Sequence, residues 1–269
     1  MTKIPVQLLF LLAIIITMLG ACNKDEPLVI LPLDQDVQLG AQVHEEILSM
    51  QDSLPILPEQ QYAQAYQYLR NIMNSIVASD DILYNEEFGY DKIYIIRNDE
   101  ELNAFATPGG YVYVYTGLLK YLDSEDHLAG VLGHEIAHAD RRHTVRAIQR
   151  ELGLQLLLDV ALGQNQGAVV QVVRALGDLR YSRSNEEEAD QFSVRYLSNS
   201  QSPYECDGAA GFFEKLQSED GAGGTPEFLS THPSPGNRIE AIQAEAAARS
   251  CDTAPCTSCS YQQFKNMLP

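Results

Sequence analysis

The residues best suited to chemistry lie at positions 134–138, which read His-Glu-Ile-Ala-His. On a helix, His134 and His138 are one turn apart on the same face, so both imidazoles reach one metal ion. Glu135 projects beside them, where its carboxylate would accept a proton from the attacking water. The pattern is typical of zinc hydrolases and predicts a zinc site on a helix.

A catalytic zinc ion needs a third protein ligand, and a second acidic segment offers several. Glu186, Glu187 and Glu188 open a predicted helix, where acidic side chains also complement the helix dipole. Glu186 and Asp190 are four residues apart and therefore share a face. Glu186 could bind the metal while Asp190 accepts a hydrogen bond from a ligand imidazole. Spacing alone does not choose Glu186 over its two neighbours.

The surrounding sequence predicts an α+β fold dominated by helices, with a small sheet. Apolar periodicity predicts helices over Asp34–Met50, Glu59–Val77, Ser124–His143, Val145–Leu162, Gln166–Leu179, Ser184–Asn199, Glu205–Ser218 and Pro235–Arg249. Short strands are predicted over Lys92–Arg97, Asn103–Ala106 and Tyr111–Tyr115, the last two joined by the turn signal Pro108-Gly109-Gly110.

The N-terminus predicts export. Residues 1–21 combine a basic start with a short apolar stretch and small residues, as a signal peptide does. Leu19-Gly20-Ala21-Cys22 resembles a bacterial lipobox, in which Cys22 would be acylated, with palmitate among the chains, and become the new N-terminus. An uncleaved anchor or an ordinary signal peptide is the alternative. Asn23 in place of an aspartate favours the outer membrane.

Four parts are expected along the chain: a signal peptide (1–21), a tether (22–33), a peptidase-like domain (34–250) and a cysteine-containing tail (251–269). In the tether, Lys24-Asp25-Glu26 reads either as a surface-export signal or as a solvated linker. Four cysteines beyond Cys22 suggest two disulfides in an oxidising compartment, with the pairing of Cys206, Cys251, Cys256 and Cys259 open. A stapled tail is favoured over a redox pair or a zinc ribbon at Cys256–Cys259.

The chain is strongly acidic, with 18 Lys and Arg against 37 Asp and Glu among 269 residues and a formal charge of −19. This balance argues against a nucleic-acid partner, which needs a basic face. It also disfavours docking on anionic lipid headgroups through charge, so attachment to the membrane is assigned to the lipid on Cys22.

Four blocks of the sequence resemble the M48 family of zinc metallopeptidases, which includes periplasmic quality-control proteases, mitochondrial inner-membrane relatives and the CAAX prenyl proteases. The blocks are Asn103–Ala106 with Gly109–Val114 and Gly117–Leu119, then His134–His138 with Arg142-His143, then Ser182-Arg183 with Glu186 and Ala189-Asp190, and finally His232-Pro233 with Arg238-Ile239. Their order and spacing follow the family over roughly Asp34–Arg249.

The resemblance implies a role for each matching position. Glu186 resembles the third zinc ligand and Asp190 the carboxylate that orients a ligand imidazole. His232 and Arg238 resemble a pair that faces the scissile carbonyl and would stabilise the developing oxyanion. In some periplasmic members the equivalent of His232 instead caps the zinc and holds the protease latent. His143 recurs in the family without an assigned role.

The resemblance also implies a place for the substrate. The strand containing Tyr111, Val112 and Tyr113 resembles the sheet edge beside the zinc cleft. A substrate peptide would add there as a further strand, through main-chain hydrogen bonds that tolerate many sequences.

We therefore expect a zinc metalloendopeptidase with one zinc ion per chain, lipid-anchored in the envelope of a Gram-negative-type bacterium. Its substrates would be unfolded or misassembled envelope proteins. One alternative is a latent protease that acts mainly as a chaperone or assembly factor for outer-membrane proteins. A purely structural zinc site is disfavoured, because a structural site has no use for Glu135. The sequence leaves open whether His232 caps the zinc.

Overall fold

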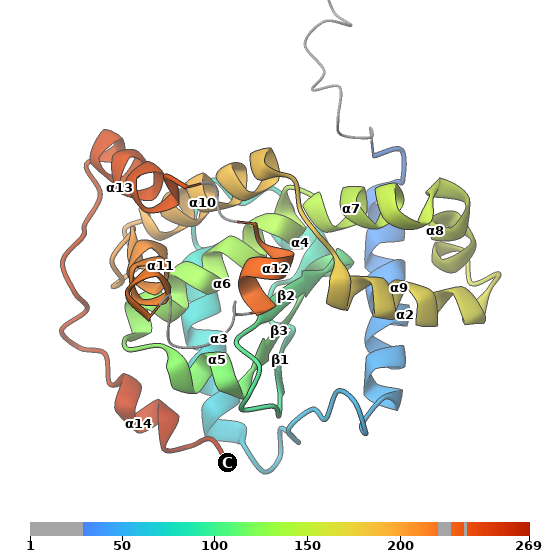
Figure 1. Ribbon diagram of the computed structural model, residues 1–269, viewed down its shortest axis with the longest axis horizontal. Helices are drawn as coiled ribbons and strands as arrows, with labels where there is room; N and C mark the ends of the chain where they lie inside the picture. The colour runs from blue at the N-terminus through green and yellow to red at the C-terminus, as the bar shows by residue number, and fades with distance from the viewer. Residues whose placement is uncertain (1–28, 220–226, 234–235) are drawn as a thin grey trace, which may run out of the picture.

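The computed structural model describes residues 29–219, 227–233 and 236–269, and its fold is α+β and mainly helical, as predicted (Figure 1). The signal peptide and Cys22 lie outside the described residues. The elements are α2 (Leu33–Ser49), α3 (Ala63–Val77), α4 (Asn85–Phe88), β1 (Ile93–Ile96), β2 (Ala104–Thr107), the 3-10 turn η1 (Pro108–Gly110), β3 (Tyr111–Tyr115), α5 (Thr116–Tyr121), α6 (Glu125–Asp140), α7 (His143–Leu152), α8 (Leu154–Ala161), α9 (Gln166–Asp178), α10 (Arg183–Leu197), α11 (Gly208–Glu219), α12 (Glu227–Thr231), α13 (Arg238–Arg249) and α14 (Tyr261–Lys265).

Two residues with positive φ set helix boundaries in the helical region, and the second of these boundaries was not predicted from the sequence. Arg142 adopts a left-handed conformation with φ of 58°, so α6 ends at Asp140 and α7 starts in a new direction. Gly153 has φ of 85° and splits the predicted 145–162 helix into α7 and α8. Glycine adopts this conformation without a steric penalty. None of the described helices is long and apolar enough to span a bilayer.

The three strands form one sheet in the order β1-β3-β2. The strand β2 pairs antiparallel with β3, as the predicted hairpin requires, and β1 pairs parallel with the other side of β3. The prediction that Tyr111, Val112 and Tyr113 lie on a sheet edge is therefore wrong. A hairpin fixes which two strands are neighbours, but not which of them the third strand will join.

The sheet separates two helical layers, and its alternating side chains serve both. Ile93, Val112 and Val114 face the core shared with α3, α6, α10 and α11. Ile96 and Tyr113 face a second core shared with α2, α7, α8 and α9. Figure 1 shows the sheet between these two groups of helices. Helix α6 lies in the first core, with all of its residues from Leu128 to Asp140 buried.

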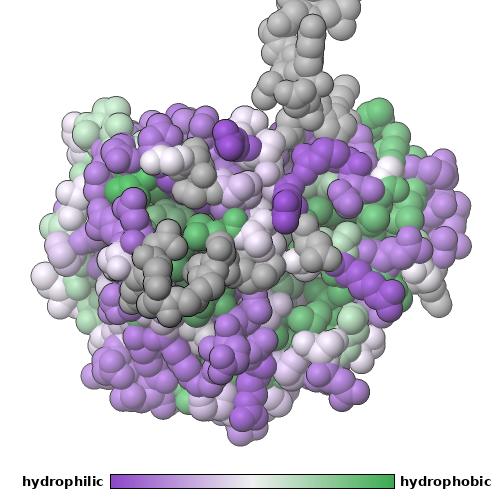
Figure 2. All heavy atoms as spheres, viewed as in Figure 1, coloured by the Kyte–Doolittle hydropathy of each residue, from purple (hydrophilic) through white to green (hydrophobic). Residues whose placement is uncertain are grey.

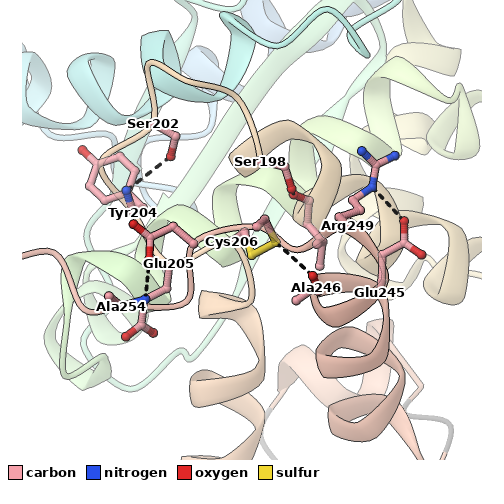
Figure 3. Close-up of a disulfide and its surroundings, with 12 residues drawn as sticks. Ser198, Ser202, Tyr204, Glu205, Cys206, Glu245, Ala246, Arg249 and Ala254 are labelled. Atoms are coloured by element: carbon pink, nitrogen blue, oxygen red, sulfur yellow. Dashed lines mark hydrogen bonds and ion pairs between the residues drawn. A yellow bond between two sulfur atoms is a disulfide. The ribbon is translucent and has the colours of Figure 1, made fainter.

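The four cysteines of the C-terminal region form two disulfides, Cys206–Cys251 and Cys256–Cys259. The first joins the segment before α11 to the end of α13 (Figure 3). The tail then returns to the domain, where the ring of Phe264 is fully buried and stacks on Tyr68.

Candidate metal centre

Two imidazoles converge on the inner face of α6. Ser124 caps this helix, because its Oγ accepts a hydrogen bond from the backbone N–H of His127. His134 and His138 lie one turn apart, are almost wholly buried, and hold their Nε2 atoms 2.9 Å from each other. Both nitrogens therefore face the same small volume, as the sequence predicted for a shared metal.

Helix α10 brings a carboxylate to the same volume. Its first turn is capped by Ser182, whose Oγ accepts from the N–H of Asn185. Glu186 is fully buried, with its carboxylate oxygens 3.4 Å from His134 Nε2 and 3.3 Å from His138 Nε2. Glu187 is exposed, and Glu188 pairs with Arg141 at 3.0 Å. The geometry thus selects Glu186 from the three glutamates.

A fourth group enters from the segment after α12. His232 Nδ1 lies 3.1 Å from Glu186 Oε1 and 3.3 Å from His134 Nε2. The ring is almost completely buried and stacks on Phe228, with ring centroids 4.3 Å apart. One ligand atom from each of His134, His138, Glu186 and His232 lies within 4.8 Å of all the others. His232 therefore sits at the metal centre, in a position to act as a capping ligand.

The residues fit a zinc ion. Two imidazoles and one carboxylate are the protein ligands of one class of catalytic zinc site. Both carboxylate oxygens of Glu135 are buried and have no hydrogen-bond partner among the described residues, which is costly unless a bound group or water satisfies them. Burial raises the pKa of Glu135 and lowers that of His138 well below its usual value. A neutral His138 keeps its lone pair available for a metal.

Asp190 and Arg238 form a second ring around the ligands. Asp190 Oδ1 lies 2.9 Å from His134 Nδ1, a contact that fixes the orientation of that imidazole. Arg238 donates from Nε and Nη2 to the two oxygens of Asp190, at 2.6 and 2.8 Å. Its Nη2 is also 3.1 Å from Glu186 Oε2. Arg238 thus lies at the centre. Its guanidinium contacts the carboxylates of Asp190 and Glu186, whereas the family resemblance implied that it would face the scissile carbonyl.

His143, for which no role was predicted from the sequence, also lies at the site. Its Nδ1 lies 3.2 Å from His138 Nδ1, and its Nε2 lies 3.2 Å from Glu188 Oε2. His143 therefore contacts the Nδ1 side of His138, as Asp190 contacts the Nδ1 side of His134. The signal available in the sequence was its position five residues after His138, beyond the turn at Arg142.

The sheet edge beside the centre is β2, and its outer side is partly occupied. The Thr144 hydroxyl donates to the Ala106 carbonyl at 3.1 Å. Helix α12 is fastened to the chain before β2, since the Phe228 N–H donates to the Leu102 carbonyl at 3.2 Å. Figure 1 shows α12 between α6 and the sheet. The helix that precedes His232 is thus attached beside the β2 edge of the sheet.

Comparison with known proteins gives one family. The model of peptidase family M48 matches residues 63–246. The chain is 34% identical over 188 residues to a putative beta-barrel assembly-enhancing protease of Vibrio cholerae, covering 64% of this chain and 37% of that protein. It is 28% identical over 248 residues to the beta-barrel assembly-enhancing protease of Yersinia pestis, covering 87% and 48%. It is 29% identical over 215 residues to the mitochondrial metalloendopeptidase OMA1 of Schizosaccharomyces pombe, covering 78% and 61%. The chain spans less than half the length of the two bacterial relatives.

Proposed function

Because the chain belongs to peptidase family M48, we propose that it is a zinc-dependent metalloendopeptidase with one zinc ion per chain. His134, His138 and Glu186 would hold the ion. The observation that carries the proposal is the convergence of these three buried side chains beside Glu135, whose carboxylate has no hydrogen-bond partner among the described residues. Among the described residues, the basic group nearest to this carboxylate is His232, whose Nε2 lies 3.6 Å from Oε1. A structural zinc site would not need Glu135.

Zinc, when bound, would polarise the scissile carbonyl and acidify the attacking water. The protein's own part in the reaction is proton transfer and orientation. Glu135 takes the proton of the attacking water and returns a proton to the leaving amine. A carboxylate only accepts hydrogen bonds, so Asp190 keeps the proton of His134 on Nδ1 and leaves Nε2 free for the metal. Arg238 holds Asp190 in that position.

The proposed substrates are unfolded or misassembled envelope proteins, and the proposed place is the outer membrane, reached through acylated Cys22. The support is the lipobox-like sequence before Cys22 and the names of the bacterial relatives, which describe assembly of β-barrels. The substrate strand would pair with β2, the strand at the edge of the sheet nearest the centre.

The test is cleavage of an unfolded β-barrel protein by the purified chain. We expect a chelator to stop cleavage and added zinc to restore it. Glu135→Gln should keep the bound zinc and lose turnover, whereas Glu187→Gln, which changes an exposed neighbour of the ligand, should keep both. Normal turnover by Glu135→Gln would refute the proposed mechanism.

A second candidate function is that of a latent protease acting mainly as an assembly factor. It is favoured by His232, which lies 3.1 Å from Glu186 at the metal centre, and by α12, which is hydrogen-bonded to the chain just before β2. His232→Ala should then raise the rate of cleavage of the same substrate. If cleavage falls instead, His232 serves the reaction, as the oxyanion role expected for it requires.

A further inference from the structure

The helices α7, α8 and α9 carry apolar surface that the fold does not bury. On α8, Leu157, Val160 and Ala161 face the core, which is the expected inward stripe. The flanks of this stripe are also rich in leucine: Leu154, Leu156 and Leu158 are half-buried, and Leu162, just after the helix, is 53% exposed. Gln155 and Asp159 lie between them on the outer face and are joined by a hydrogen bond. We call the four flanking leucines the α8 patch. Figure 2 shows hydrophobic surface gathered over α8, at the right of the view.

The charge around the α8 patch differs from that of the rest of the molecule. Residues 141–183 contain seven of the 18 basic residues, all arginine, and three of the 37 acidic ones. This segment has a formal charge of +4 in a chain of −19. Arg141 forms an ion pair with Glu188, and Arg142 forms one with Asp36. The side chains of Arg150, Arg174, Arg180 and Arg183 are exposed.

The described chain starts beside the same helices. Val29 packs in the core that also contacts Leu156 and Leu158. The Leu31 carbonyl accepts a hydrogen bond from Arg142 at 2.5 Å, just before α7 begins. Ile30, between them, is 64% exposed. Cys22 precedes Val29 by seven residues, which span at most about 25 Å in any conformation. An acylated Cys22 would therefore hold this side of the domain near a lipid surface.

We propose that the α8 patch, with Ile30, docks on an anionic phospholipid bilayer. This inference rests on the acylation of Cys22 in the proposed function. A single apolar contact or a single lipid chain binds weakly, and two signals together give stable attachment. Leucine with neighbouring arginine is the composition of an interfacial helix, because apolar side chains enter the acyl boundary and arginines meet lipid phosphates.

The distribution of charge determines which side of the domain faces the bilayer. The residues outside 141–183 are strongly acidic and are repelled by anionic headgroups, so the arginine-bearing side is the side that can approach. The net charge of the whole chain argued against such docking. The segment 141–183 changes that expectation, because it is basic, contains α8, and is joined to the start of the described chain through the hydrogen bond from Arg142 to Leu31.

The test places a fluorophore on either side of the domain. The described cysteines are paired in disulfides, so a cysteine introduced at Gln164, just beyond the α8 patch, can be labelled selectively. Gln51, also exposed, lies beyond the far end of α2 and gives the matched control. The acylated full chain is placed on phosphatidylethanolamine and phosphatidylglycerol vesicles that contain a nitroxide-labelled lipid as quencher. We expect strong quenching at position 164 and little at 51.

Two pairs of variants separate the contribution of apolar side chains to the docking from the contribution of arginines. Leu162→Glu and Arg174→Glu should each weaken the quenching at 164, whereas Leu48→Glu on the end of α2 and Arg97→Glu after β1 should leave it unchanged. Equal quenching at 164 and 51 on bound protein would overturn the proposal. Contact between labels at 164 on two chains, without lipid quenching, would assign the patch to a second copy and also overturn it. A chain that does not bind the vesicles at all instead refutes the acylated anchor, and peptidase activity is measured separately on a soluble substrate.

Discussion

At the scale of single residues, each imidazole that α6 brings to the candidate metal centre contacts a different partner through its second nitrogen. Asp190 holds His134, and His143 holds His138. His143 is in turn fixed by Glu188, which is bound by Arg141. Partners of this kind set the orientation of a ligand ring and raise its affinity for the metal.

We predict that His143→Phe weakens zinc binding by about 10- to 100-fold, the usual loss when such a partner is removed. His143→Gln, whose amide can still contact His138 and Glu188, should recover part of the affinity. The measurement is competition for zinc with a chelator of known affinity. His44→Phe removes a buried imidazole outside the centre and serves as the control. Unchanged zinc affinity in His143→Phe would show that its contact with His138 is incidental.

A second residue-scale prediction concerns Glu205. Burial, followed by the nearby charges of Asp126, Asp207 and Asp252, raises the pKa of Glu205 to about 7. A carboxyl whose pKa is higher in the folded than in the unfolded state favours folding when protonated, so its contribution to stability is lost as the pH rises through 7. Glu205→Gln should therefore be more stable than the parent at pH 8 and similar to it at pH 4.

The stability of Glu205→Gln is measured by urea unfolding across that pH range. Glu86→Gln, which removes an exposed carboxylate of α4, controls for the loss of one negative charge. A Glu205→Gln variant that follows the parent at every pH would contradict the assigned pKa.

The residues of the centre were accessible from the sequence to different degrees. His134 and His138 were predictable because helix geometry alone puts them on one face. Glu186 needed the family resemblance, since three adjacent glutamates have the same chemistry and only their helical phase separates them. His143 was recognised as recurrent in the family but given no role, because it lies beyond the left-handed Arg142 and no local periodicity connects it to His138.

At the scale of elements, the position of α6 depends on close approach by its neighbours. A Cβ added at Gly130 would lie 2.1 Å from the Ala209 backbone nitrogen of α11. A Cβ at Gly133 would lie 2.8 Å from Ser193 Oγ of α10. These two glycines let two helices pack directly against the helix that carries His134.

We predict that Gly130→Ala destabilises the protein by about 1–3 kcal/mol, or prevents folding, because the backbone of α11 must move. Gly177→Ala is the matched control: it lies in α9 with nothing within 4 Å of the added Cβ, and should stabilise the protein by up to about 1 kcal/mol. Thermal unfolding of both variants gives the comparison. Equal stability of Gly130→Ala and the parent would mean that α6 and α11 can separate without cost.

The hairpin of the sheet could be predicted from the sequence, but the order of its three strands could not. The hairpin of β2 and β3 followed from alternating apolar residues around Pro108-Gly109-Gly110. The pairing of β1 with β3 depends on long-range packing against the two helical layers. It places β3 in the middle of the sheet and leaves β2 at the edge.

At the scale of the whole molecule, the Cys206–Cys251 disulfide connects two elements that frame the centre. Helix α11 packs on α6, and α13 begins with Arg238, which grips Asp190. Figure 3 shows the disulfide beside the last turn of α13. Four cysteines allow three pairings, and the pairing could not be predicted because it depends on where α11 and α13 end in space.

We predict that replacing both Cys206 and Cys251 by alanine costs about 4 kcal/mol of stability, the chain entropy of a loop of this length. Replacing both Cys256 and Cys259 should cost about half as much, because that disulfide closes a loop of only a few residues. Urea unfolding of the two double variants under non-reducing conditions gives the ranking. A larger loss for the Cys256 and Cys259 pair would contradict it.

The proposed metal ligands are widely separated along the chain, with His134 and His232 lying 98 positions apart. If the chain is exported N-terminus first, as proposed, its two α6 histidines emerge well before Glu186, and His232 emerges later still. Two imidazoles alone would hold zinc loosely, so the emerging chain would carry no competent centre while its own unfolded segments are within reach. Zinc would bind firmly only after α10 has docked on α6. The order of emergence would then protect the nascent chain from self-digestion.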